Sequence, residues 1–225
     1  MSRSRWPMLC AMAGIVGPLL FTATFLVQEQ FRRAEYNPVA EPVSALEAGP
    51  NGWIQQVNFV VFGVLLFAFA VGLHYEVRPT RFGIAGPAVI AWGGVGLVLA
   101  ATFPLREDVS GATYDPTGLH YVSGPITFGS IAVGLVVLSR RLARDPRWRS
   151  LAGYTLGTGI AVALMFVAFA LLVRPDDAPL HDYLGLAQRA TLAVWLPCLV
   201  ILAVRLLRLT REAPALAPAD LAHAP

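Results

Sequence analysis

Long apolar runs separated by short polar connections organise the whole chain. Six stretches approach or exceed the roughly 20 residues that a helix needs to cross the hydrocarbon core of a bilayer. They cover residues 6–27, 53–74, 82–103, 120–139, 151–173 and 184–206. The pattern predicts an all-α bundle of six transmembrane helices within residues 1–211. Residues 212–225, rich in Ala and Pro and without an apolar period, are predicted to form a disordered tail.

Composition and charge agree with a membrane protein and give it an orientation. The chain is 56% hydrophobic and 14% charged, with a mean hydropathy of +0.60. Every basic residue is an arginine, and most arginines fall at the two chain ends and in the second and fourth connections. The positive-inside rule therefore predicts cytoplasmic termini and a long first outer loop. Arginines used as flanking anchors, without interleaved aromatics, argue against nucleic-acid binding.

The first outer loop contains the stretch YNPVAEPVSALEAGPNGW, residues 36–53. Its three prolines disfavour a continuous helix. Ser44 and Glu47 have the spacing of a capping box, which fits one helical turn that ends at Gly49. The stretch is more apolar than a floppy loop of Gly, Ser and charged residues. We therefore expect a lid over the outer mouth of the bundle.

The fourth span carries a polar stripe at helical spacing. Its members share one helical face: His120, Ser123, Thr127 and Ser130. Polar groups at membrane depth are costly and often mark functional sites. For Thr127 and Ser130, bonding of the hydroxyl to its own helix backbone is an equally good explanation.

Gln188 and Arg189 lie near the start of the sixth span, where a cation opposes the positive end of the helix dipole. An acidic partner on the same side would compensate this charge. The candidates are Glu47, Asp108, Asp115 and Asp182. Alternatively, Arg189 extends to lipid phosphates as an ordinary interfacial arginine.

These residues together predict an outward-facing polar pocket. Its expected ligand-binding residues are Ser44, Glu47, Asp108, His120, Ser123, Gln188 and Arg189. For catalysis the candidates are Glu47, Asp108 and His120, and a serine nucleophile at position 44 or 123 is a weaker alternative. His120, His181 and Asp108 could contribute metal ligands, but their spacing is not that of a metal motif, so we predict no metal.

The order of motifs along the chain resembles a known family. The first outer loop, FPLRED after the third span, a histidine opening the fourth and GLAQR opening the sixth are similar to the bacterial domain-of-unknown-function family numbered 998. That resemblance implies a six-span protein of the inner membrane, without an established reaction. It draws attention to eight positions: Ser44, Glu47, Gly52, Pro104, Asp108, His120, Gly185 and Arg189. The chain departs from the simplest pattern at LRED, where two charged residues precede Asp108.

Three functions fit these features. The first is an inner-membrane protein whose outer pocket binds a lipid headgroup or small amphiphile, with membrane lipids and a possible protein partner as its associates. The second is a membrane-embedded hydrolase that uses histidine and acids, in the layout of ceramidase-like enzymes. The third is a transporter, which the scarcity of polar groups at mid-membrane depth disfavours.

Overall fold

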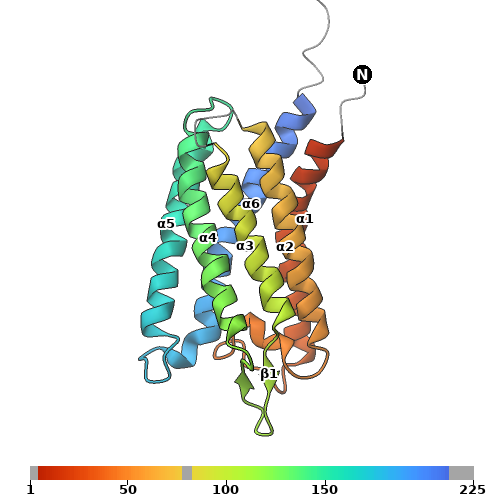
Figure 1. Cartoon of the computed structure of the whole chain (residues 1–225), viewed down its shortest axis with the longest axis vertical. Helices are drawn as coiled ribbons and strands as arrows, with labels where there is room; N and C mark the ends of the chain where they lie inside the picture. The colour runs from red at the N-terminus through yellow and green to blue at the C-terminus, as the bar shows by residue number, and fades with distance from the viewer. Residues whose placement is uncertain (1–4, 78–82, 213–225) are drawn as a thin grey trace, which may run out of the picture.

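Six long helices carry the chain back and forth along one axis in the computed structural model, which describes residues 5–77 and 83–212 (Figure 1). They are α1 (Trp6–Phe31), α2 (Trp53–Glu76), α3 (Ala85–Thr102), α4 (Leu119–Leu142), α5 (Arg149–Leu172) and α6 (Leu184–Glu212). Each is long and apolar enough to cross a membrane. The predicted all-α architecture with six spans is confirmed. The expected tail falls, apart from Glu212, outside the described residues, as do Arg78 and Arg81.

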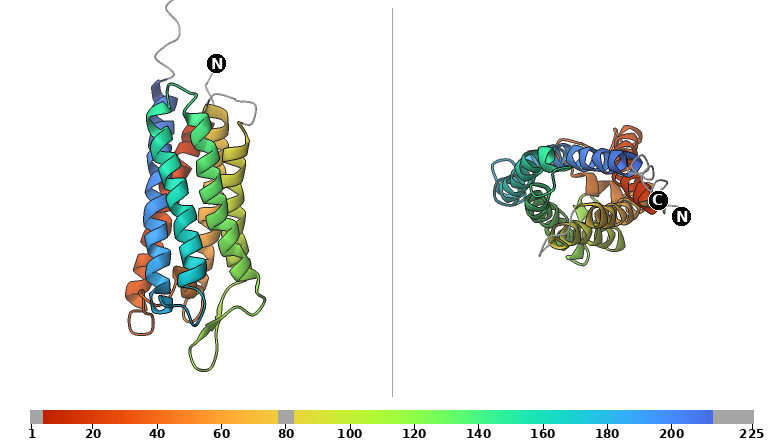
Figure 2. Two further views of the ribbon diagram at one scale, coloured as in Figure 1. Left: turned by 90° about the vertical axis from the view of Figure 1, so that its left-hand side faces the viewer. Right: turned by 90° about the horizontal axis from the view of Figure 1, so that it is seen from above.

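The helices form a closed ring in sequence order (Figure 2). Each helix packs against the next along the chain, and α6 returns to pack against α1. Because the helices alternate in direction, α1 begins and α6 ends at the same end of the bundle, which we call the terminal end. The connections 32–52, 103–118 and 173–183 lie at the opposite end, which we call the loop end.

Short elements occupy the loop end. A 3-10 turn, η1 (Val43–Glu47), lies in the first connection, and η2 (His181–Tyr183) leads into α6. The connection 103–118 folds into an antiparallel hairpin of β1 (Arg106–Glu107) and β2 (Thr113–Tyr114), which projects beyond the helices (Figure 1). The apolar pattern gives no hint of this hairpin because its strands have two residues each.

Glycines allow neighbouring helices to approach closely. A Cβ at Gly63 of α2 would lie 2.7 Å from the Gly94 carbonyl oxygen of α3, and one at Gly94 would lie 2.6 Å from the Gly63 oxygen. Such contacts suit a bilayer, where lipid tails provide no hydrophobic drive between helices. Gly153 and Gly157 of α5, by contrast, have open space where a Cβ would be. Their GxxxG spacing therefore does not serve packing within the bundle.

Arginines close the terminal end. Arg141 of α4 is buried and donates to the carbonyl oxygens of His74, Val77 and Gly83, where α2 ends and the chain approaches α3. Arg147 forms ion pairs of 2.9 Å with both Asp145 and Glu76. These contacts satisfy the carbonyls that a helix leaves unpaired at its C-terminus. The arginines expected to act as anchors thus also hold α2, α4 and α5 together.

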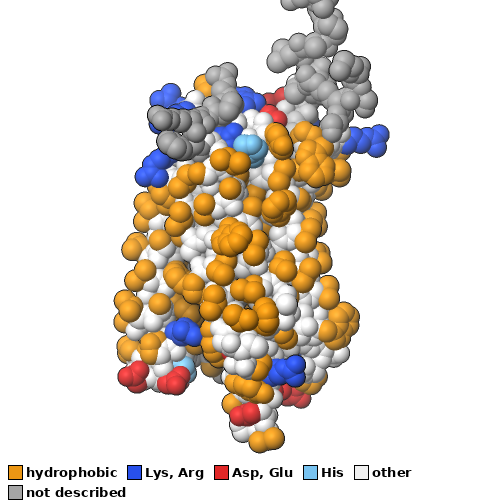
Figure 3. Space-filling model, viewed as in Figure 1, with side chains coloured by type: hydrophobic (Ala, Val, Ile, Leu, Met, Phe, Trp, Pro, Cys, Tyr) orange, Lys and Arg blue, Asp and Glu red, His pale blue; other side chains and the backbone are white. Residues whose placement is uncertain are grey.

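The outer surface has the distribution expected of a membrane-spanning bundle. Hydrophobic side chains cover the middle of the face shown in Figure 3, and charged side chains gather at its two ends. Many large apolar residues of the helices are exposed, including Val64, Leu164 and Leu171 at 59–67%. In water such a surface would be an aggregation liability, so it fits contact with lipid.

Candidate functional site

A cavity of about 1030 Å³ lies inside the loop-end half of the helix ring. All six helices contribute to its lining, together with residues of the first connection. Its deep part is aromatic: the Phe21 and Phe62 rings stack at 4.9 Å between centroids, and Phe62 stacks on Trp195 at 5.7 Å. Polar side chains line the part nearer the loop end, among them His120 and Gln188. The cavity is therefore apolar at depth and polar toward the loops.

The first connection packs onto the bundle. Of the η1 turn, Val43, Ala45, Leu46 and Glu47 are buried. The helical turn expected here is present, but it is a 3-10 turn that begins after Pro42, and no side chain caps it. Ser44 lies inside the turn and lines the cavity instead of capping. Gly49 follows with a φ of +70°, a conformation that favours glycine.

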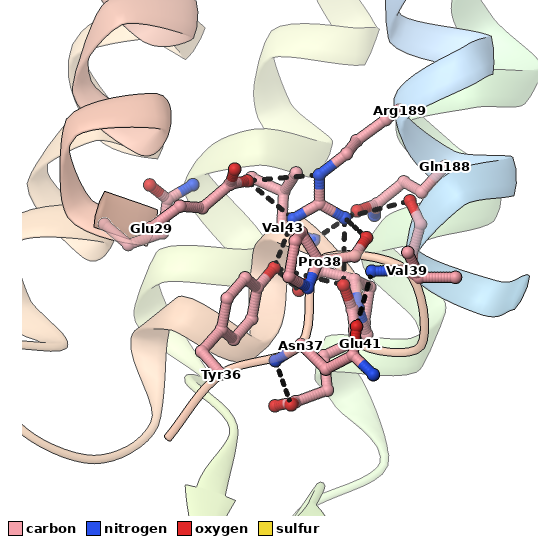
Figure 4. A network of polar contacts seen from close by, with 12 residues as sticks. Glu29, Tyr36, Asn37, Pro38, Val39, Glu41, Val43, Gln188 and Arg189 are labelled. Atoms are coloured by element: carbon pink, nitrogen blue, oxygen red, sulfur yellow. Dashed lines mark hydrogen bonds and ion pairs between the residues drawn. The ribbon is translucent and has the colours of Figure 1, made fainter. Parts of the chain in front are cut away.

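Arg189 of α6 fastens this connection (Figure 4). Its guanidinium donates to the carbonyl oxygens of Pro38 and Glu41 at 2.7 and 2.9 Å and to the Tyr36 hydroxyl. Burial raises the pKa of Tyr36 to about 12 despite the opposing charge of Arg189. The phenol therefore stays protonated, and its hydroxyl donates to the carbonyl oxygens of Glu41 and Pro42. One arginine thus holds the loop at several points.

The carboxylate partner of Arg189 is Glu29, at 2.5 Å. The prediction of an acidic partner for Arg189 is confirmed, but the predicted identity of that partner was wrong. The four expected partners do not take this position: Glu47, Asp108, Asp115 and Asp182. The reason is that α1 continues to Phe31, four residues beyond the predicted end of the span. Glu29 thereby becomes a helical residue, four positions after Phe25 and on the same face.

The extra turn of α1 supplies further contacts that sequence reasoning missed. Gln28 donates from Nε2 to the Leu46 and Asn51 carbonyls, both at 3.3 Å. Arg32 donates to the Ala48 carbonyl at 2.6 Å and pairs with Glu107 at 3.0 Å. One sequence signal for these contacts was available: Gln28 and Arg32 are polar residues at i, i+4 spacing directly after the predicted span.

Glu47 of the first connection lies against His120 of α4. Glu47 Oε2 lies 3.2 Å from His120 Nδ1, and the Glu47 side chain is fully buried. Nδ1 is also 3.2 Å from the Phe103 carbonyl oxygen. The carboxylate of Glu47 is thus stabilised by His120 and by the Leu105 backbone N–H. Burial raises the pKa of the Glu47 carboxyl, and His120 partly opposes this shift.

The polar stripe of α4 faces inward as expected, because all four of its residues are buried. The Ser123 hydroxyl donates to the His120 carbonyl at 2.6 Å, which is the backbone bonding of an ordinary helical serine. Thr127 donates across to the Gly93 carbonyl of α3 at 3.4 Å. Both side chains line the cavity, but their hydrogens are engaged.

Gln188 has a positioning role. Its Oε1 accepts a hydrogen bond of 2.6 Å from the backbone N–H of Val43, which is the first residue of η1. The turn is thereby tied to α6 one residue before Arg189. Gln188 also lines the cavity, so it connects the loop to the wall.

Asp108 does not belong to the cavity. It lies in the exposed turn of the β1–β2 hairpin, where its carboxylate accepts bonds from Ser110 and the Ala112 N–H. The Ser110 hydroxyl and these backbone groups lower the pKa of Asp108. The prediction that Asp108 belongs to the pocket was therefore wrong, because the hairpin carries Asp108 away from the helices.

No cluster of three or more potential metal ligands occurs within residues 5–77 and 83–212. His120 and His181 both line the cavity, whereas Asp108 lies in the hairpin turn. The three candidate metal ligands are therefore not brought to one point.

Two glycines highlighted by the resemblance lie where the chain approaches itself. A Cβ at Gly185 would lie 2.5 Å from the Pro38 carbonyl oxygen and closer still to that of Glu41. One at Gly52 would collide with the Glu47 carbonyl. Both positions therefore require glycine if the first connection is to pack against α6 and α2.

The six apolar helices and their lipid-type surface define a multi-span membrane protein. The chain belongs to the family described as Protein of unknown function (DUF998), whose model matches residues 15–205. The match runs from the middle of α1 almost to the end of α6, and it confirms the resemblance. No curated protein and no solved structure matches the chain significantly.

Proposed function

We propose that the chain binds the headgroup of a lipid, or another small amphiphile, in the cavity at the loop end. The observation that carries this proposal is the division of the cavity into an aromatic depth and a polar mouth with His120 against the buried Glu47. An amphiphile has the same division. The first connection, held by Arg189, covers this mouth.

The distribution of arginines supports an orientation for this site. We infer that the terminal end, with Arg140, Arg141, Arg144, Arg147 and Arg205, faces the cytoplasm of a bacterium. Both termini are then cytoplasmic and the cavity opens on the outer side of the inner membrane. The ligand would come from the outer leaflet or from the space beyond it.

The polar mouth must supply most of the affinity and selectivity. A lipid tail that moves from the bilayer into the cavity exchanges one apolar environment for another and gains little. A headgroup, in contrast, gains charge-assisted hydrogen bonds in a region of reduced dielectric. His120 is the natural first contact because its imidazole lines the cavity while Glu47 lies behind it.

Native mass spectrometry of the protein extracted in a mild detergent tests the proposal. We expect a bound species with the mass of a membrane lipid in the wild-type protein, and loss of most of it in His120→Gln. Arg141→Gln, at the terminal end, is the control and keeps the bound lipid. A wild-type protein that carries no amphiphile and takes up none on addition would refute the proposal.

A second candidate, a membrane-embedded hydrolase, is favoured by the same Glu47–His120 pair. A carboxylate behind an imidazole can orient the ring and stabilise its protonated form during catalysis. Ser44 lines the same cavity, whereas the Ser123 hydroxyl is bonded to the helix backbone. Release of a fluorescent acyl chain from ester- or amide-linked lipids, abolished in both Glu47→Gln and His120→Gln, would favour the enzyme over the binding protein.

A further inference from the structure

We propose that the ligand is a phospholipid that enters the cavity sideways from the bilayer, between α4 and α5. This inference rests on the proposed function and adds a route and a ligand class to it. The relevant stretch of wall runs from Tyr121 to Phe128 on α4 and from Phe166 on α5 to Arg174 just after it, and residues of both stretches line the cavity.

The cavity wall differs sharply from one side to the other. On the sides formed by α1, α2 and α6, the lining rings are sealed, with Phe21, Phe62 and Trp195 no more than 2% exposed. On the side formed by α4 and α5, Tyr121 is 46% exposed, and Ala170 is also exposed. The wall is therefore thinner on the α4–α5 side than at these three rings.

Gly124 lies in this thin wall. It lines the cavity, yet a Cβ built on it meets no heavy atom within 4 Å. Pro125, the next residue, lacks the backbone N–H that would bond to the preceding turn of α4. Neither residue presents a bulky side chain to the helix opposite, so this level of α4 leaves room for an acyl chain.

Two contacts border the thin region, one made by Arg174 just after α5 and one made by α5 itself. Toward the loop end, the Arg174 guanidinium lies 4.8 Å from the centre of the Tyr121 ring. Toward the middle of the bundle, the Phe128 and Phe166 rings stack at 6.3 Å. Tyr121 and Phe128 are seven residues apart, which corresponds to about 10 Å along a helix. That height exceeds the width of an acyl chain.

The helix beside this region is the least enclosed of the six. In its most apolar window, 22% of the α5 residues are buried, compared with 44–50% in the other five helices. It packs against α4 and α6 and has exposed apolar residues along much of its length. Small outward movements of α5 therefore break few buried contacts, and local opening is easiest where few apolar contacts hold an element.

The chemistry at the loop-side border favours a phosphate. Arg174 is exposed and held there by a ring contact that a phosphate oxygen can replace with charge-assisted hydrogen bonds. His181 lines the same mouth, and its buried Nδ1 has no hydrogen-bond partner within the described part of the chain. Acidic residues also line the mouth, namely Glu35, Glu41, Glu107 and Asp176. A headgroup that carries an ammonium group as well as the phosphate suits this mixture.

Quenching of Trp195 by brominated phospholipid tests the route. The parent protein carries Trp6→Phe, Trp53→Phe and Trp92→Phe, because these three tryptophans are at least 50% exposed and would contact bulk lipid. Trp148 is fully buried among the terminal-end residues and stays as a reference. The probe is a zwitterionic phospholipid with dibrominated acyl chains, added in mixed micelles, and the rate of quenching is recorded by stopped flow.

We expect Gly124→Phe to slow the quenching of Trp195 at least tenfold. Gly129→Phe is the matched control, since Gly129 also lies on α4 with open space at its Cβ but does not line the cavity. It should change the rate by less than twofold. A water-soluble, short-chain brominated amphiphile, which can enter through the loop end, should still quench Trp195 in Gly124→Phe.

The remaining outcomes separate the two proposals. If Gly124→Phe is quenched as fast as Gly129→Phe, the route between α4 and α5 is wrong while the cavity still binds lipid. If Gly124→Phe also excludes the short-chain probe, the added ring fills the cavity and the route is not supported. If the parent protein shows no quenching of Trp195 by either probe, the cavity holds no tail and the proposed function itself is wrong.

Discussion

Both ends of the bundle are held by arginines, yet they have opposite consequences. At the terminal end, Arg141 and Arg147 bond to helix-terminal carbonyls and to Asp145 and Glu76, and they draw α2, α4 and α5 together. At the loop end, Arg189 also bonds to carbonyls and to one carboxylate. These carbonyls, however, belong to a loop that lies over a cavity.

The difference shows how one kind of interaction can either close a bundle or build a site. At the loop end a carboxyl group, Glu47, is fully buried beside His120. Burying such a group is costly unless it is paired. The contact with His120 offsets part of this cost.

The largest effect should come from Arg189→Gln. The change leaves Glu29 buried without its partner and releases the Pro38 and Glu41 carbonyls. We expect a loss of about 3–5 kcal/mol in the free energy of unfolding, the range for breaking one side of a buried ion pair. Unfolding in sodium dodecyl sulfate measures it. The double variant Arg189→Gln/Glu29→Gln should recover part of this loss of stability. If the single and double variants lose the same free energy of unfolding, the unpaired Glu29 carboxylate is not the cause of the loss.

Arg141→Gln should also destabilise, by about 2–3 kcal/mol, because carbonyls at the end of α2 lose charged donors. Unlike Arg189→Gln, it should leave lipid binding unchanged, since Arg141 is at the terminal end. Proteolysis of the first connection distinguishes the two variants: cleavage should rise in Arg189→Gln and not in Arg141→Gln. The opposite pattern would contradict the division between the two ends.

Gly185→Ala probes how tightly the first connection rests on α6. The added methyl group would push against the Pro38 and Glu41 carbonyls, and we expect a loss of about 1–3 kcal/mol, as for other overpacked positions. Gly124→Ala is the control, because its methyl group enters open space and improves helix propensity. Thermal unfolding in detergent compares the two, and equal midpoints would show that the loop is not pressed against α6.

The smallest effect concerns pH. Burial raises the pKa of Glu47 above its usual value of 4.5, so the folded protein holds this proton more tightly than the unfolded chain does. The stabilisation is complete below about 4.5 and is lost as the pH rises through the raised pKa. Glu47→Gln removes this dependence, so the wild type should lose stability relative to the variant over that interval. Parallel curves for both proteins would show that Glu47 does not titrate there.

Much of the fold could be predicted because bilayer thickness leaves few choices for six apolar runs. The inward face of α4 followed from spacing alone, and Glu47 and His120 do lie in contact, although Glu47 itself does not line the cavity. The partner of Arg189 could not be found in this way, because Glu29 is 160 residues away and two residues beyond the apolar run. Asp108 was misplaced because two-residue strands leave no alternation to detect.

A titration with a short-chain zwitterionic phospholipid tests the central claim most directly, namely that the polar mouth at His120 determines binding. Isothermal titration calorimetry of the wild type, His120→Gln and the terminal-end control Arg141→Gln gives three dissociation constants. We predict that His120→Gln weakens binding at least tenfold, about 1.4 kcal/mol, while Arg141→Gln binds as the wild type does. Equal dissociation constants for all three proteins would contradict the account.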